Sequence, residues 1–183
     1  MIWIILGVIA LLVVFAIVAY NGLIRSRNQV DNAWSQIDVQ LKRRIDLIPN
    51  LVETVKGYAA HEKETLEAVV NARNAAIAAP SSDPHATANA DNMMTGALKQ
   101  LFALSERYPD LKANQNFLAL QEELTATEGR VAYARQFYND SVLTYNTKLQ
   151  TFPTVLFAAL LKFAKRDYFE ADAADRQVPK VQF

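Results

Sequence analysis

The chain has 183 residues, and its 19 Lys and Arg are balanced by 19 Asp and Glu, so its net charge is zero. This balance argues against a nucleic-acid-binding protein, which normally carries a basic excess. The absence of cysteine excludes disulfides, thiol catalysis and thiolate metal sites. The length suffices for one domain with a hydrophobic core, and the scarcity of Gly and Pro favours helices.

The N-terminal segment, residues 2–19, is uncharged and almost entirely apolar. Its 18 residues are just enough to cross a bilayer core as a helix. Trp3 and Tyr20 flank it, as aromatic residues do at the two membrane interfaces. A cleaved signal peptide would have a basic start and a small-residue cleavage site, and neither is evident. We therefore predict a retained transmembrane anchor over residues 1–20.

The basic residues beside this segment predict its orientation. No Lys or Arg precedes it, whereas Arg25 and Arg27 follow closely. Because basic flanks stay on the cytoplasmic side, we expect the N-terminus outside and the following domain in the cytoplasm. These two arginines, with Trp3 and Tyr20, are the predicted membrane-interface residues.

Apolar residues then recur every three or four positions, which predicts a long packed helix from Asn28 to Ala79 with a narrow, coiled-coil-like seam. The seam runs from Val30 to Ala59 and continues through Leu66 to Arg73. The stretch "AAPSSDPHA" predicts a loop, after which Asp83 is the expected N-cap and Pro84 the first residue of a second helix.

The second helix is expected to end at Pro109, and a third, from Phe117 to Leu149, carries an equally regular apolar stripe. A fourth helix is predicted over residues 154–169. It is apolar nearly all round, which favours a buried helix, the alternative being a helix on the membrane surface. Residues 170–183 are expected to form an extended tail. No strand pattern occurs, so residues 21–169 predict an all-α fold, an elongated antiparallel bundle of about four helices.

Pro49 falls inside the first predicted helix of this bundle. A proline there costs about 3 kcal/mol, because it removes a hydrogen bond and clashes with the carbonyl of Ile45. The apolar residues around it, once buried, contribute about 1.5 to 3 kcal/mol each, so the helix is expected to continue with a kink. The kink either lets the helix curve around its partners or marks a partner-contact site. A break into two helices is the third interpretation. The predicted contact residues are Asp46, Pro49, Asn50 and Glu53.

Few other residues suggest chemistry. The stretch "HEKE", residues 61–64, lacks the second histidine of a zinc motif and is interpreted as a solvated helix face. Tyr138 and Tyr145 lie on the seam of the third helix and are interpreted as polar core contacts that fix helix register. The charge run from Asp38 to Asp46, which includes Arg44, is interpreted as a solvated face. No catalytic residue, cofactor or metal site is predicted.

Two stretches carry a resemblance to a known family: "YNGLIRSRNQVDNAWSQIDVQLKRRIDLIPNLVETVKGYAAHEKETLEAVVNAR" and "YPDLKANQNFLALQEELTATEGRVAYARQFYNDSVLTYNTKLQTFP". The chain resembles the LemA family of bacterial membrane proteins over most of residues 20 to 170. It departs from the family pattern at Ile45, often aromatic, and at Gly129, often Asn. The resemblance implies a single-pass protein of the bacterial inner membrane with a cytoplasmic helical bundle. It implies no enzymatic activity.

The resemblance also implies partners. One relative takes part in forming magnetosome membranes, and other members are encoded beside a membrane metalloprotease. The leading hypothesis is a membrane-anchored scaffold or adaptor that binds a membrane protein, such as that protease, or further copies of itself. Its setting would be membrane organisation or envelope quality control. The alternatives are a sensor switched by the Pro49 kink and an enzyme with an unrecognised carboxylate site.

Overall fold

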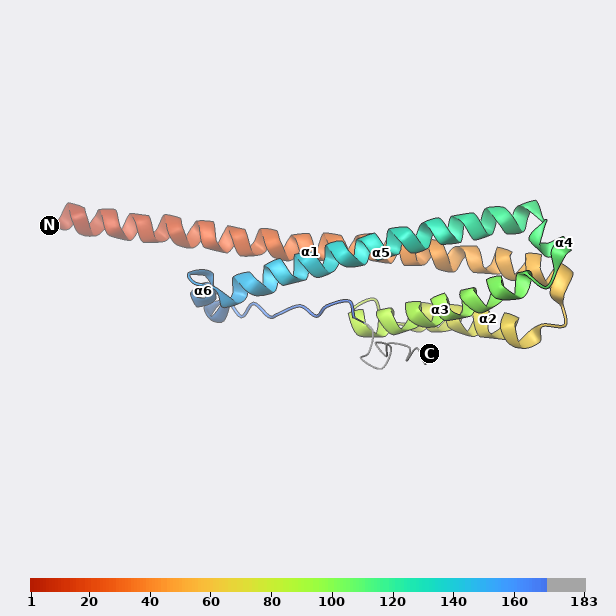
Figure 1. The fold of residues 1–183 in the computed structure, drawn as a ribbon. Coiled ribbons are helices and arrows are strands. Elements are labelled where there is room, and N and C mark those ends of the chain that lie inside the picture. The colour runs from red at the N-terminus through yellow and green to blue at the C-terminus, as the bar shows by residue number, and fades with distance from the viewer. Residues whose placement is uncertain (171–183) are drawn as a thin grey trace, which may run out of the picture. The chain divides into compact units, whose positions relative to one another are not determined.

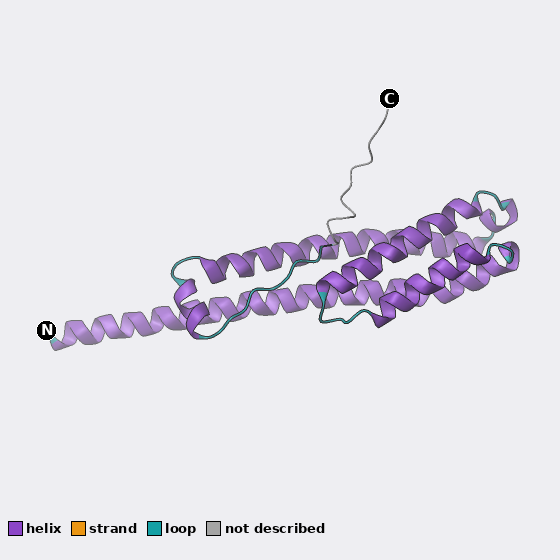
Figure 2. Cartoon of the chain, turned by 90° about the horizontal axis from the view of Figure 1, so that it is seen from below, coloured by secondary structure: helices purple, strands orange, loops and turns teal. Residues whose placement is uncertain are grey.

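The computed structural model describes residues 1–170 and is all-α, as the sequence predicts, with no strand in that range. Figure 1 shows the helices in chain order by colour, and Figure 2 shows them in a second view with the loops in teal. They are α1 (Ile2–Ala59), α2 (Lys63–Ala78), α3 (Pro84–Ser105), α4 (Pro109–Lys112), α5 (Gln115–Gln150) and α6 (Thr154–Leu160). The tail predicted over residues 170–183 lies, apart from its first residue, outside the described part of the chain.

The chain forms two compact units. The anchor unit comprises residues 1–36 and 136–168, and the core unit comprises residues 37–135 with the described residues 169 and 170. Helices α1 and α5 contribute to both units, and each unit is described below by itself.

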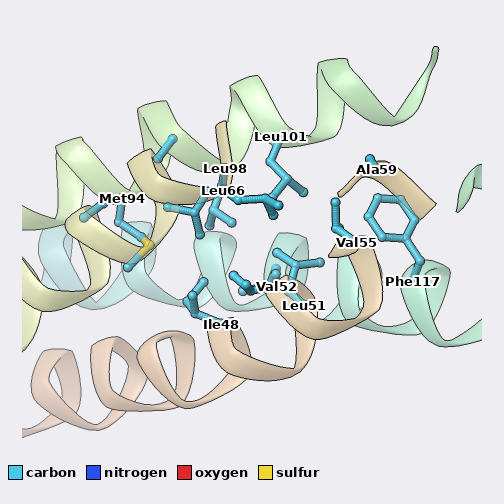
Figure 3. Packing of buried hydrophobic residues seen from close by; sticks show 14 of the residues in the cluster. Ile48, Leu51, Val52, Val55, Ala59, Leu66, Met94, Leu98, Leu101 and Phe117 are labelled. Carbon is cyan, nitrogen blue, oxygen red and sulfur yellow. The ribbon is translucent and has the colours of Figure 1, made fainter. Parts of the chain in front are cut away.

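The core unit holds one continuous hydrophobic cluster, to which α1, α2, α3, α4 and α5 all contribute (Figure 3). Helix α1 supplies Ile48, Leu51, Val52, Val55 and Ala59, all buried, and all of these except Leu51 belong to the predicted seam. Burying such side chains contributes about 1.5 to 3 kcal/mol each. The remaining members are Leu66, Val69, Ala72, Met94, Ala97, Leu98, Leu101, Leu111, Phe117 and Leu124.

The predicted helix from Asn28 to Ala79 is wrong in one respect, because the chain turns at residues 60–62 and α2 begins as a new helix. In a straight helix Leu66 would lie about 21 Å from Val52. The turn instead brings Leu66 into the same cluster as Val52. The Glu62 carboxylate holds this corner, since it accepts hydrogen bonds from the Tyr108 hydroxyl at 2.9 Å and from Arg107 at 3.3 Å.

The helix is unbroken through Pro49, so the interpretation with a break at that residue is wrong. Ile48, Leu51 and Val52 are buried on either side of the exposed proline, and their burial outweighs its cost.

Helix α3 begins as predicted but ends early. The Asp83 carboxylate accepts hydrogen bonds from the backbone N–H groups of His85 and Ala86 at 3.0 and 3.1 Å. The helix ends at Ser105 rather than at Pro109. Proline disfavours the helical conformation of the residue before it, and Tyr108 is accordingly extended in φ, at −123°, before α4 starts.

The fourth predicted helix is much shorter than expected, because α6 stops at Leu160. Lys162 adopts a left-handed φ of 54°, and the N–H of Phe163 donates to the carbonyl of Ala158. This is the Schellman arrangement that terminates helices, here with Lys at the position that glycine usually takes. The buried-helix interpretation is also wrong, since Ala158 is the one residue of α6 that is buried.

Candidate functional site

The four predicted contact residues lie on α1 within the core unit. Asp46, Pro49, Asn50 and Glu53 are all exposed. Their spacing of three and four residues places them on one helix face. Asn50 and Glu53 also line a groove of about 540 Å³, whose other walls are Thr54 of α1 and Asn116, Ala119 and Leu120 of α5. The face is therefore accessible to a partner, and its role as a contact site stays a prediction.

A buried ionic cluster, which the sequence did not reveal, lies elsewhere in the core unit. The Asp91 carboxylate of α3 accepts a hydrogen bond from Arg44 of α1 at 2.7 Å and a second from Arg135 of α5. Arg44 also donates to the Thr95 hydroxyl at 3.0 Å. The interpretation of the charge run as a solvated face is wrong for Arg44, whose side chain is only 3% exposed.

The position of Arg44 explains this burial. It lies three residues after Leu41 and four before Ile48, and so falls on the buried stripe of α1. A charge there is tolerated only with partners, and Asp91 supplies one. Arg135 lies with its guanidinium over the Phe169 ring, 4.6 Å from the centroid. The cluster therefore ties α1, α3 and α5 together, which is a structural role.

A cavity of about 380 Å³ adjoins this cluster between α1, α2 and α3. Its lining carries both signs of charge, with Asp38, Lys42, Asp46 and Arg73 beside Arg44 and Asp91. The buried Nε of Arg73 has no hydrogen-bond partner. Within residues 1–170 no group of three or more His, Asp or Glu is placed to hold a metal ion. His61, the start of "HEKE", lies in the turn between α1 and α2 rather than on a helix.

In the anchor unit α1 carries the candidate membrane span, and its residues are exposed up to Val18 with the exception of half-buried Ala16. Such a run is unlike the core helix of a soluble protein, which is mostly buried. Trp3 and Arg25 are exposed. Tyr20 contacts Phe163 edge-on with ring centroids 6.3 Å apart, and the Arg27 guanidinium lies over the Phe163 ring, 5.8 Å from its centroid. The interface roles of these four residues stay predictions.

The hydroxyls of the seam tyrosines of α5 bind backbone carbonyls, and the Tyr138 ring also packs against Trp34 of α1, with ring centroids 5.2 Å apart. The Tyr138 hydroxyl donates to the carbonyl of Asp167 at 2.9 Å, and the Tyr145 hydroxyl donates to the carbonyl of Ala164 at 3.0 Å. The Asn146 side chain bonds both the N–H and the carbonyl of Arg166. Burial raises the pKa of Tyr138 to about 12. These polar contacts hold the extended segment after α6, and their role in fixing helix register stays a prediction.

Comparison with known proteins gives one family and several relatives. A family model described as LemA family matches residues 33–183. Protein LemA of Metamycoplasma hominis is 29% identical over 158 residues, which cover 85% of this chain and 71% of that protein. Magnetosome protein MamQ 2 of Paramagnetospirillum magneticum is 25% identical, covering 92% and 73%. Magnetosome protein MamQ of Magnetospirillum gryphiswaldense is 24% identical, covering 87% and 68%. None of these names states a reaction.

Proposed function

Because the chain belongs to the LemA family, we propose that it is a single-pass, membrane-anchored helical scaffold or adaptor that acts by binding other proteins or further copies of itself. The observation that carries this proposal is the continuity of α1. One helix contains both the exposed apolar span and the buried stripe of the core unit, from Ile37 to Ala59. The same helix therefore supplies both the proposed anchor and a part of the core unit.

The proposed setting is the bacterial inner membrane, with the N-terminus outside and the core unit in the cytoplasm. Arg25 and Arg27 at the end of the span support this orientation. The relatives that are named as magnetosome proteins support a role in membrane organisation. A membrane metalloprotease is the partner proposed for a role in envelope quality control.

The exposed face of α1 is the proposed contact surface. It joins the groove at Asn50 and Glu53, whose amide and carboxylate offer both donors and acceptors to a partner. Displaying many copies of such a face on one membrane raises their effective concentration, so that weak individual contacts suffice for assembly.

Site-specific photocrosslinking in intact membranes tests this surface. A photoreactive amino acid would replace Asn50 or Glu53, and the matched control would replace Glu67, an exposed residue of α2. Adducts formed from positions 50 and 53, but not from position 67, are expected. An adduct of twice the chain mass supports a self-assembling scaffold, and an adduct with a different protein supports an adaptor. Equal or absent adducts at all three positions would overturn the proposed contact surface.

A further inference from the structure

The loop at the end of α5 exposes a concentrated set of apolar side chains. We call residues 151–163 the α6 loop. Within it Phe152 is 81% exposed, Leu156 62%, Leu160 77% and Leu161 47%. Large apolar patches on a protein surface mark sites that bind a membrane or another protein.

The place of this loop within the anchor unit distinguishes these two possibilities. Phe157 of α6 contacts Phe15 of α1, with ring centroids 6.2 Å apart, and Phe15 belongs to the candidate membrane span. The α6 loop is therefore level with the C-terminal end of the span. Phe163, at the end of the loop, contacts Tyr20, which lies about 7.5 Å further along α1. This offset matches the depth of about 5 to 10 Å to which interfacial helices sink into a bilayer.

Basic side chains lie next to the exposed apolar residues of the α6 loop, at the level of Tyr20. Arg27, Lys162, Lys165 and Arg166 line one cavity of about 390 Å³, and no carboxylate lines it. Arg166 is also paired with Asp31 at 2.8 Å. Between Gln150 and Arg166 the sequence contains no Asp or Glu. The exposed apolar side chains of the α6 loop thus come first, the rings of Phe163 and Tyr20 second, and these four basic side chains, here called the basic rim, third. Acyl chains, interface and phosphates follow one another in the same order in a leaflet.

The basic rim is held in place by backbone contacts. The Schellman turn at Lys162 redirects the chain, and Tyr145 and Asn146 of α5 bind the backbone of Ala164 and Arg166. Because α5 binds the backbone of this segment, the side chains of Lys162 and Lys165 stay exposed.

We propose that the α6 loop is a second membrane-binding element, which inserts Phe152, Leu156 and Leu160 into the leaflet beside the α1 span. The cavity around Lys162 and Lys165 then binds the phosphates of anionic phospholipids. This inference rests on the membrane anchor of the proposed function. It holds for either orientation of the chain, because the loop contacts α1 at the end of the span that leads into the folded part.

The full chain in lipid nanodiscs tests insertion. The sequence contains no cysteine, so single-cysteine variants can each carry one NBD fluorophore. Leu160→Cys probes the loop, Ile9→Cys the anchor, and Tyr133→Cys, an exposed position of α5 in the core unit, serves as the water control. The NBD emission of the loop probe is expected to shift to shorter wavelength. Iodide quenching should be lost and quenching by shallow doxyl lipids gained, in contrast to the Tyr133→Cys probe.

The phosphate contacts are tested by lipid composition. Adding phosphatidylglycerol to phosphatidylcholine discs is expected to increase the blue shift of the loop probe. The variant Lys162→Gln with Lys165→Gln should lose this increase while its helical circular dichroism stays unchanged. Inorganic phosphate added to phosphatidylcholine discs should not replace the anionic lipid.

Each other outcome overturns a defined part of the inference. A loop probe as open to iodide as the Tyr133→Cys probe, with Ile9→Cys still quenched by lipid, overturns loop insertion and leaves the anchor intact. Failure of lipid quenching at Ile9→Cys overturns the anchor and this inference together. A response that is independent of phosphatidylglycerol, or reproduced by inorganic phosphate, overturns the assignment of the cavity to anionic phospholipid. If iodide quenching of the loop probe is lost only when another membrane protein is present, the loop binds a protein partner and the proposed insertion into lipid is overturned.

Discussion

Replacing Asp91 should destabilise the core unit more than any surface substitution, because this carboxylate neutralises a buried cation. Asp91→Ala removes the carboxylate partner of Arg44, whose side chain is 3% exposed and, within residues 1–170, keeps the Thr95 hydroxyl at 3.0 Å as its one hydrogen-bond partner. Breaking one side of a buried ion pair costs about 3 to 5 kcal/mol. The side chain of Arg135 is 30% exposed, so it can turn toward water, and the loss of its ion pair with Asp91 adds little to this cost. The expected loss is a large part of the roughly 5 to 15 kcal/mol that stabilises a typical domain.

The second substitution isolates the cause of that loss. Arg44→Met in the Asp91→Ala background removes the orphaned cation and keeps an apolar chain on the buried stripe of α1. Apolar replacement of a whole buried ion pair is often neutral or stabilising. The free energy of unfolding of the double variant should therefore exceed that of Asp91→Ala alone by about 2 kcal/mol or more.

Urea unfolding of the full chain in detergent micelles, followed by far-ultraviolet circular dichroism, measures these free energies. The control is Glu106→Ala, which removes a salt bridge to Lys112 whose two side chains are more than half exposed. That variant should change the free energy of unfolding by less than about 1 kcal/mol. An Asp91→Ala loss no larger than that of the control, or a further loss on adding Arg44→Met, would refute the reasoning.

Four further substitutions probe local features of the helices. Gly129→Ala should stabilise the chain by about 0.5 to 1 kcal/mol in the same assay, because its Cβ would meet no atom within 4 Å. Asp83→Ala should lose about 1 kcal/mol with the cap of α3. Pro49→Ala should stabilise α1 by up to about 3 kcal/mol and leave the photocrosslinks unchanged, and altered crosslinks would instead favour a switch at the kink. The raised pKa of Tyr138 contributes stability that is complete below pH 10 and is lost as the pH rises towards 12. Tyr138→Phe should therefore flatten this loss in the free energy of unfolding measured against pH.

Periodicity was enough to predict which face of each long helix is buried. On α5 the stripe of Phe117, Leu124, Val131, Tyr138 and Tyr145 is buried as expected, because a spacing of three and four residues defines one face whatever packs against it. Periodicity could not locate the turn at residues 60–62. The buried positions Ala59 and Leu66 are seven residues apart, which is also the spacing of a continuous seam, and no Pro or strong N-cap residue marks the break.

Arg44 shows why the buried cluster could not be predicted. Lys42, Arg43 and Arg44 look alike in the sequence, and only the register of α1 turns one of them inward. Its partner Asp91 is 47 residues away, on a helix whose side of contact depends on the turn at residues 60–62. Local patterns carry no information on such a pairing until the packing of the helices is known.

The segment after α6 poses the reverse problem, since its sequence favours a helix that does not form. A helix over residues 161–168 would satisfy its own carbonyls, whereas the extended segment needs outside donors for them. Helix α5 supplies these donors at Tyr138, Tyr145 and Asn146, which recur at the helical spacing of seven and eight residues. The polar groups interrupting the seam of α5 are therefore the physical reason that α6 ends early. They also leave Lys162 and Lys165 exposed beside Tyr20 instead of distributing them around a helix. If this account is right, Tyr145→Phe with Asn146→Leu should loosen the basic rim and weaken the phosphatidylglycerol response of the loop probe, while the lipid quenching of Ile9→Cys in the span stays unchanged.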